Sequence, residues 1–197
     1  MYSRQEYDNL KRKYGGYSSW AIWDEKNPKD PSIIESSLDT LNSRYVFLGL
    51  NISKELSDTP WQNFHGGRHD RKLMKLVSRS PHLRGSYLTD LFKDFPEAKS
   101  SALKNIPEDI IKGHVHIFSK EMEDIGITDG TVFVVLGNDV SGYFKKYFQG
   151  KYKNNKIIDY YHYSYYGKGM TYQNWINGLL EKIKRVGRGR GTRYIRL

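Results

Sequence analysis

Short apolar runs alternate with longer helical patterns along this chain, and that alternation restricts the fold more than any other feature of the sequence. The apolar runs are YVFLGL at residues 45–50, GSYLTDL at 85–91, TVFVVL at 131–136 and KIIDYY at 156–161. Helical periodicity marks residues 68–78, 107–124, 139–148 and 171–185. Apolar strands separated by helices are typical of a parallel sheet with both faces covered. The sequence therefore predicts an α/β fold, with a central, largely parallel sheet of four strands and helices on both faces.

The chain has 197 residues, a length that suits one compact domain. Its lack of cysteine excludes disulfides, thiolate nucleophiles and Cys-ligated metal sites. No apolar run approaches the ~18 residues that span a membrane, and the polar N-terminus is unlike a signal peptide. We therefore expect a cytoplasmic protein that has no membrane partner and acts as a monomer.

The positive charge of the chain is concentrated at its end. Lys and Arg number 32 against 22 Asp and Glu, which gives a net charge of +10. Residues 182–197 hold seven of the basic residues and no acid, so residues 1–181 carry only 25 − 22 = +3. Arg188, Arg190 and Arg193 lie in a Gly-rich stretch that suits contact with nucleic-acid phosphates. We expect a main domain at 1–181, beginning with a helical extension at 1–44, and a basic tail at 182–197.

Two of the predicted strands end in loops with unusual polar residues. In open parallel sheets, ligands bind beyond the carboxyl ends of the strands, where the strand order changes direction. The stretch GLNIS at 49–53 places Asn51 and Ser53 at the end of the first strand, and HYSYYG at 162–167 follows the last strand. Because loop residues at this edge often bind or react, Asn51 and His162 are the first candidates for function.

These two loops resemble the two signatures of the uracil-DNA glycosylase superfamily. GLNIS is similar to the Gly-x-Asn first signature of the branch that acts on uracil and thymine mismatches, and HYSYYG is similar to the His-Pro-Ser-type second signature. Residues 63–77, 84–94 and 134–148 are also similar to that branch in character, so the resemblance covers roughly residues 45–180 in the right order. The chain departs from the family at Ile52 and Tyr163, where proline is usual, and at Asp90, where many members carry Asn.

The resemblance implies a glycosylase-like fold and hydrolysis of the bond between a flipped base and its deoxyribose, without a cofactor. It implies that Asn51 holds the attacking water and that His162 donates to a carbonyl oxygen of the base. Phe64 would stack on the base, with Asp90 and Gly49 beside it. Because an ionised carboxylate cannot donate to O4 of uracil, we expect Asp90 to govern the choice of base and to make it pH-dependent.

The partner implied is single- or double-stranded DNA. Tyr165 or Tyr166 would fill the space that the flipped base leaves in the stack. The remaining expected DNA contacts are Ser53, Ser164, Lys168, Arg188, Arg190 and Arg193.

Two other interpretations stay open. The departures from the family also fit a glycosylase-fold module that binds DNA and has lost its chemistry. Asp90 with Glu97 and Lys99 resembles the acids and lysine of a magnesium-dependent nuclease, although FPEAKSS does not have the pattern of a strand. His65 and His69 have the i, i+4 spacing of metal ligands on a helix, but two glycines separate them, and we predict no metal site.

Overall fold

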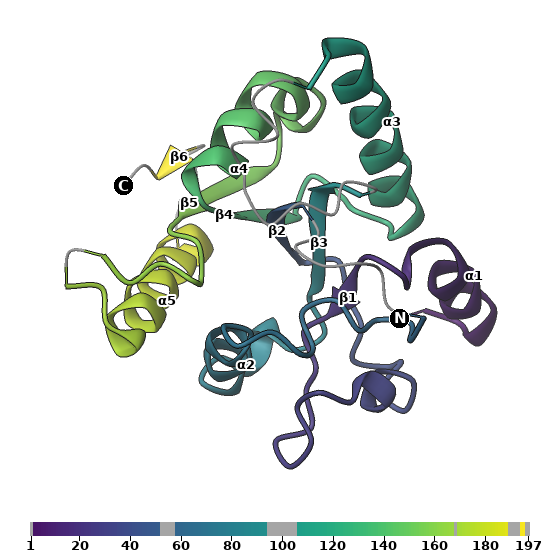
Figure 1. Ribbon diagram of the computed structural model, residues 1–197, viewed down its shortest axis with the longest axis vertical. Helices are drawn as coiled ribbons and strands as arrows, with labels where there is room; N and C mark the ends of the chain where they lie inside the picture. The colour runs from purple at the N-terminus through teal and green to yellow at the C-terminus, as the bar shows by residue number, and fades with distance from the viewer. Residues whose placement is uncertain (1, 52–57, 94–105, 168, 189–193, 196–197) are drawn as a thin grey trace.

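The computed structural model describes residues 2–51, 58–93, 106–167, 169–188 and 194–195. Its central sheet has the strand order β1-β3-β2-β4-β5-β6 (Figure 1). The four middle strands are parallel and coincide with the four predicted runs: β3 (Tyr87–Phe92), β2 (Tyr45–Asn51), β4 (Val132–Leu136) and β5 (Lys156–Tyr160). The prediction of an α/β fold with a largely parallel sheet is therefore confirmed.

Two short edge strands extend the predicted sheet of four strands to six. β1 (Ser19–Trp20) pairs antiparallel with β3, and β6 (Tyr194–Ile195) pairs parallel with β5. Each has two residues, which is too short for an alternating pattern to be visible in the sequence. Pairing with an existing strand, rather than local sequence preference, accounts for their extended backbone.

Helices cover both faces of the sheet, as predicted. α2 (Arg71–Ser78) and α5 (Tyr172–Arg188) lie on one face (Figure 1). The other face is covered by α1 (Arg4–Tyr14), α3 (Glu108–Asp124), α4 (Asn138–Tyr143) and the π-helical turn η4 (Phe144–Phe148). Single turns of 3₁₀-helix at η1 (Pro31–Ile34), η2 (Pro81–Leu83) and η5 (Gln149–Tyr152) complete the described secondary structure. No helix among the described residues is long and apolar enough to cross a membrane.

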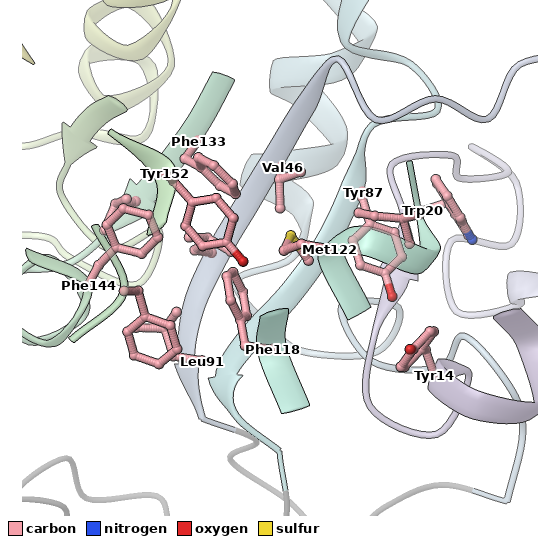
Figure 2. Packing of buried hydrophobic residues seen from close by; sticks show 14 of the residues in the cluster. Tyr14, Trp20, Val46, Tyr87, Leu91, Phe118, Met122, Phe133, Phe144 and Tyr152 are labelled. Carbon is pink, nitrogen blue, oxygen red and sulfur yellow. The ribbon is translucent and has the colours of Figure 1, made fainter. Parts of the chain in front are cut away.

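Aromatic side chains dominate the packing between the sheet and α3. Phe133 of β4 packs among Phe144 and Tyr152, and Phe118 of α3 meets Tyr152 edge to face at 5.9 Å (Figure 2). Edge-to-face and tilted pairs of this kind add about 0.5–1.5 kcal/mol beyond the burial of their area. This packing holds α3, η4 and η5 against β4.

The N-terminal residues pack against this core. Ser3 and Glu6 cap α1 reciprocally, and the chain then enters the sheet at β1. Trp20 is fully buried, with its ring 4.7 Å from that of Tyr87. At the other end, the boundary expected after residue 181 falls inside α5, because Ile183 is buried against the sheet.

A buried ion pair fixes the end of β3. Lys93 lies directly after this strand, and its Nζ is 2.5 Å from Oε2 of Glu121 on α3, both side chains being fully buried. The other oxygen of Glu121 accepts hydrogen bonds from Tyr87 at 2.9 Å and Thr89 at 2.8 Å. Removing one partner of such a pair typically costs about 3–5 kcal/mol, because the other charge stays buried. The network holds the carboxyl end of β3 in place.

The order of the four parallel strands defines the functional edge of the sheet. From β2 the chain moves to β3 on one side, whereas β4 and β5 lie on the other side. The order therefore reverses between β2 and β4, the position at which open α/β sheets bind ligands.

Candidate functional site

A cavity of about 510 Å³ opens at this reversal of strand order. Asn51 ends β2, Asp90 lies in β3, Gly137 follows β4 and His162 follows β5, and all four line the cavity. Seven of the residues predicted from the sequence meet here: Asn51, Phe64, Asp90, His162, Ser164, Tyr165 and Tyr166. Segments more than a hundred residues apart in the chain therefore form one site.

His162 is held as a neutral imidazole. The backbone N–H of Ser164 donates to its Nδ1 at 3.2 Å, and the Ser164 hydroxyl lies 2.7 Å from the same nitrogen. Because Nδ1 accepts, the ring proton belongs on Nε2. Burial lowers the pKa of His162 to about 4, with smaller contributions in the same direction from the neighbouring His69 and Lys72. The site therefore presents an uncharged N–H donor at neutral pH.

Asp90 is shifted in the opposite direction. The side chain is 4% exposed, and its Oδ2 accepts from Asn63 Nδ2 at 3.0 Å. Burial raises the pKa of Asp90 to about 6, although the Asn63 hydrogen bond and the charge of Lys93 act against that rise. Asp90 therefore changes charge within a range of pH that an assay can reach.

Gly49 leaves the room that Asp90 occupies. A Cβ at position 49 would lie 2.0 Å from Oδ1 of Asp90 and 3.9 Å from Cζ of Phe64. These two residues line the cavity, whereas Gly49, which pairs with Asp90 across β2 and β3, is not among its lining residues. The prediction that Gly49 touches the base is not tested, but its lack of a side chain is needed for the present position of Asp90.

Phe64 is fixed in an unusual backbone conformation. Its φ is 65°, a region that non-glycine residues rarely adopt. The Phe64 carbonyl accepts from Trp23 Nε1 at 3.2 Å, and Asp70 accepts from the backbone N–H groups of the two glycines that follow His65. The ring of Phe64 lies 6.4 Å from that of Tyr163 and lines the cavity. Strained backbone that the surroundings hold in place is frequent at functional sites.

The tyrosine loop after β5 is anchored by a buried cation. Nζ of Lys72 donates to the Tyr165 carbonyl at 3.1 Å and lies 3.7 Å from the centre of the Tyr166 ring. Lys72 is fully buried, and burial lowers its pKa. The Tyr165 ring stacks on Tyr161 at 5.0 Å, whereas Tyr166 is 55% exposed. Of the two tyrosines, Tyr166 is thus the one that is accessible from outside.

Several expected site residues are not among those described. Ser53, Lys168, Arg190 and Arg193 lie outside the described residues, and Arg188 is the last residue of α5. Glu97 and Lys99, on which the nuclease interpretation depends, also lie outside them.

His65 has a structural role. Its ring nitrogens lie 3.0 Å from Ser19 Oγ and 2.8 Å from the Ile22 carbonyl oxygen, and the side chain is fully buried. With both nitrogens engaged by the protein, His65 has no lone pair for a metal. In the part of the chain that the structure describes, no three His, Asp or Glu side chains gather as a possible metal site.

Sequence reasoning did not assign roles to Asn63, Asn138, Asp139 or Tyr163, all of which line the cavity. Gly137, Asn138 and Asp139 follow the third predicted strand, so their position at the functional edge was visible in the sequence. Asn63 gave no such signal, because its bond to Asp90 links a loop to a strand 27 residues away.

Comparison with known proteins adds no relative to this description. No protein-family model, no curated protein and no solved structure matches the chain. The cavity itself combines a neutral imidazole, the three amides of Asn51, Asn63 and Asn138, a buried carboxyl group and aromatic rings.

Proposed function

We propose that this protein is a DNA glycosylase that hydrolyses the N-glycosidic bond of uracil, or of a related damaged or mismatched base, after flipping it out of the stack. One observation carries the proposal: the two loops that resemble the glycosylase signatures contribute Asn51 and His162 to a single cavity at the strand-order reversal. The cavity volume of about 510 Å³ is within the range of small-molecule sites and exceeds what one base needs.

His162 stabilises the departing base. As the bond from C1′ to the base nitrogen breaks, its electron pair stays on the base, and negative charge develops on the base oxygens. The Nε2–H of neutral His162 donates to such an oxygen. A donor that is fixed in advance, as Nδ1 is fixed by Ser164, stabilises this charge without reorganisation during the reaction.

Asn51 positions the water that completes the hydrolysis. Its amide oxygen accepts a hydrogen bond from the water, whose oxygen then bonds to C1′ of the oxocarbenium-like sugar. The water loses one proton, and the base anion gains one on release. Because an amide does not act as an effective general base, bond breaking is driven mainly by the leaving group.

The aromatic residues and Asp90 select the base. Phe64 supports one face of the flipped base, and its packing on Tyr163 keeps that face in position. Asp90, when protonated, donates to O4 of uracil and accepts from N3–H, whereas its ionised form repels O4. Tyr166, which is exposed at the rim, is the better candidate of the two tyrosines for the wedge that replaces the flipped base.

A base-excision assay tests the proposal directly. Labelled single- and double-stranded oligonucleotides carrying uracil, hypoxanthine or a mismatch are incubated with the protein, and hot alkali then cleaves any abasic site. We expect cleavage only after alkali, and a loss of about 10²-fold or more in His162→Ala and Asn51→Ala with DNA binding nearly intact. Lys153→Ala, on the surface away from the cavity, is the matched control.

The other interpretations give different results in the same assay. A binding module without chemistry would retain DNA and leave no alkali-sensitive site on any substrate. A metal-dependent nuclease would cut without alkali and would stop when EDTA is added. Excision at the wild-type rate by both alanine variants would refute the assignment of the site.

A further inference from the structure

A second cavity of about 320 Å³ adjoins the first. The two share Asn138 and Asp139 as a common wall. The second cavity is also lined by Ile111, by Tyr143 and Tyr147, and by Lys146. No role described above uses these four residues.

The two tyrosines provide stacking surfaces. Tyr143 and Tyr147 are four residues apart on α4 and η4, and their rings lie 6.1 Å apart with an angle of 23° between the planes. Both side chains are half-buried, so each keeps part of its surface accessible. Tyrosine faces of this kind bind nucleobases of any sequence, because every base has a π-face.

Lys146 supplies a positive charge beside these rings. Its Nζ lies 4.7 Å from the centre of the Tyr147 ring, and the side chain is exposed. Among the described residues no carboxylate lies within ion-pair distance of it, whereas its neighbour Lys145 is paired with Asp159 at 2.7 Å. Lys146 is therefore placed to contact a phosphate group.

The charges around the cavity also orient the ligand. Asp139 on the shared wall repels a phosphate and can only accept hydrogen bonds, so it suits the N–H groups of a base edge. Lys146 follows Asp139 along the chain, on η4 rather than α4, and its positive charge attracts the phosphate. A nucleotide with its base toward the first cavity and its phosphate toward Lys146 satisfies both.

We propose that this second cavity binds the nucleotide adjacent to the flipped one, and that the protein acts on single-stranded nucleic acid. That the bound group is the nucleotide next to the flipped one rests on the proposed function of the first cavity. In a duplex the adjacent base stays paired and stacked, so it cannot enter a cavity next to the one that holds the flipped base. In a single strand both bases are unpaired and reach the two cavities together.

Binding of unmodified DNA tests the second cavity without any reaction. Fluorescence anisotropy is measured with an oligonucleotide of about ten normal nucleotides, single-stranded or in a duplex. We expect tighter binding of the single strand and a loss of roughly 5- to 100-fold in Tyr147→Leu, which removes the ring and keeps an apolar side chain. Tyr147→Phe restores the binding, because it restores the ring.

The salt dependence of the same binding tests Lys146. The slope of log K against log salt should fall by about 0.7 in Lys146→Ala and stay unchanged in Lys153→Ala. Circular dichroism melts of each variant show whether it is folded. Wild-type affinity of folded Tyr147→Leu for the single strand, or stronger binding of the duplex than of the single strand, would overturn the inference.

Excision then identifies the neighbour. In two further substrates the nucleotide 5′ or 3′ of the uracil is replaced by an abasic analogue. We expect one of the two abasic substrates to give the wild type a lower kcat/KM than the unmodified substrate does. On that abasic substrate, Tyr147→Leu should show no further loss relative to the wild type. Loss in neither substrate overturns the neighbour assignment while the glycosylase function stands. If no uracil is excised but Tyr147→Leu still weakens single-strand binding, the proposed function fails and the binding site stands.

Discussion

Lowering the pH from 8 to 5 should raise the rate of uracil excision, because Asp90 then gains its proton while His162 stays neutral. Burial raises the pKa of Asp90 to about 6, so this carboxyl gains its proton as the pH falls through that value. Burial lowers the pKa of His162 to about 4, so the imidazole remains neutral until the pH falls further. The two groups are neutral together only between these values.

The size of the effect follows from the two pKa values. If only protonated Asp90 accepts uracil, roughly 1% of the enzyme is competent at pH 8 and about 90% at pH 5. The rate should therefore rise by one to two orders of magnitude over this interval, with a maximum near pH 5. Below pH 4 the rate falls again, because protonation of His162 at Nδ1 breaks its bond from the Ser164 N–H.

Asp90→Asn is the decisive variant. Its amide donates to O4 of uracil at every pH, so the rate at pH 8 should approach the wild-type maximum and the profile should be flat from pH 5 to 8. The assay is single-turnover excision with enzyme in excess, at constant ionic strength, with an enzyme-free sample at each pH as the control for acid hydrolysis. An Asn variant that excises uracil more slowly than the wild type at pH 8 would refute the role of Asp90.

Three further predictions concern stability, geometry and charge. The pKa of Asp90 is higher in the folded state than its unfolded value of 3.8, so the folded protein loses stability as the pH rises from about 4 through 6. In urea unfolding at pH 8, Asp90→Asn should therefore be more stable than the wild type by up to about 3 kcal/mol. Gly49→Ala places its methyl group 2.0 Å from the Asp90 carboxylate, so uracil excision should fall by about 10- to 100-fold in a kinetic assay while the protein stays folded. Truncation after Arg188, which keeps all of α5, should lower the salt slope of duplex binding by roughly 2 to 3 if the arginines beyond it contact phosphates, and an unchanged slope would contradict that role.

The parallel strands were predictable because a strand that is buried on both faces has a continuous run of apolar residues. Residues 131–136 are apolar at nearly every position, and a run of that length bounded by turns fits a central strand. The carboxyl-edge rule then located the loops after β2 and β5 without knowledge of the strand order. Asn51 and His162 were found in this way, and both line the cavity.

The remaining features depend on contacts between distant segments. The positive φ of Phe64 is imposed by Trp23 and by the loop around Asp70, and nothing in the local sequence favours it. Lys72 lies on the apolar face of α2, but lysine is a residue type that is usually solvated, and here it is fully buried beneath Tyr166. Such a lysine can be recognised only when its aromatic and carbonyl partners are seen together.

Burial of the site explains why the pKa values of Asp90 and His162 are shifted in opposite directions. Removal from water penalises the charged form of either group, so it raises the pKa of the Asp90 carboxyl and lowers the pKa of the His162 imidazole. A base that leaves with negative charge is repelled by an ionised carboxylate and stabilised by a neutral N–H donor. The cavity therefore suits an anionic leaving group only when Asp90 holds its proton, and this ties the choice of base to pH through a single side chain. In the proposed reaction, Asp90 in place of the asparagine that many members of the resembling branch carry adds acid dependence and leaves the proposed roles of His162 and Asn51 unchanged.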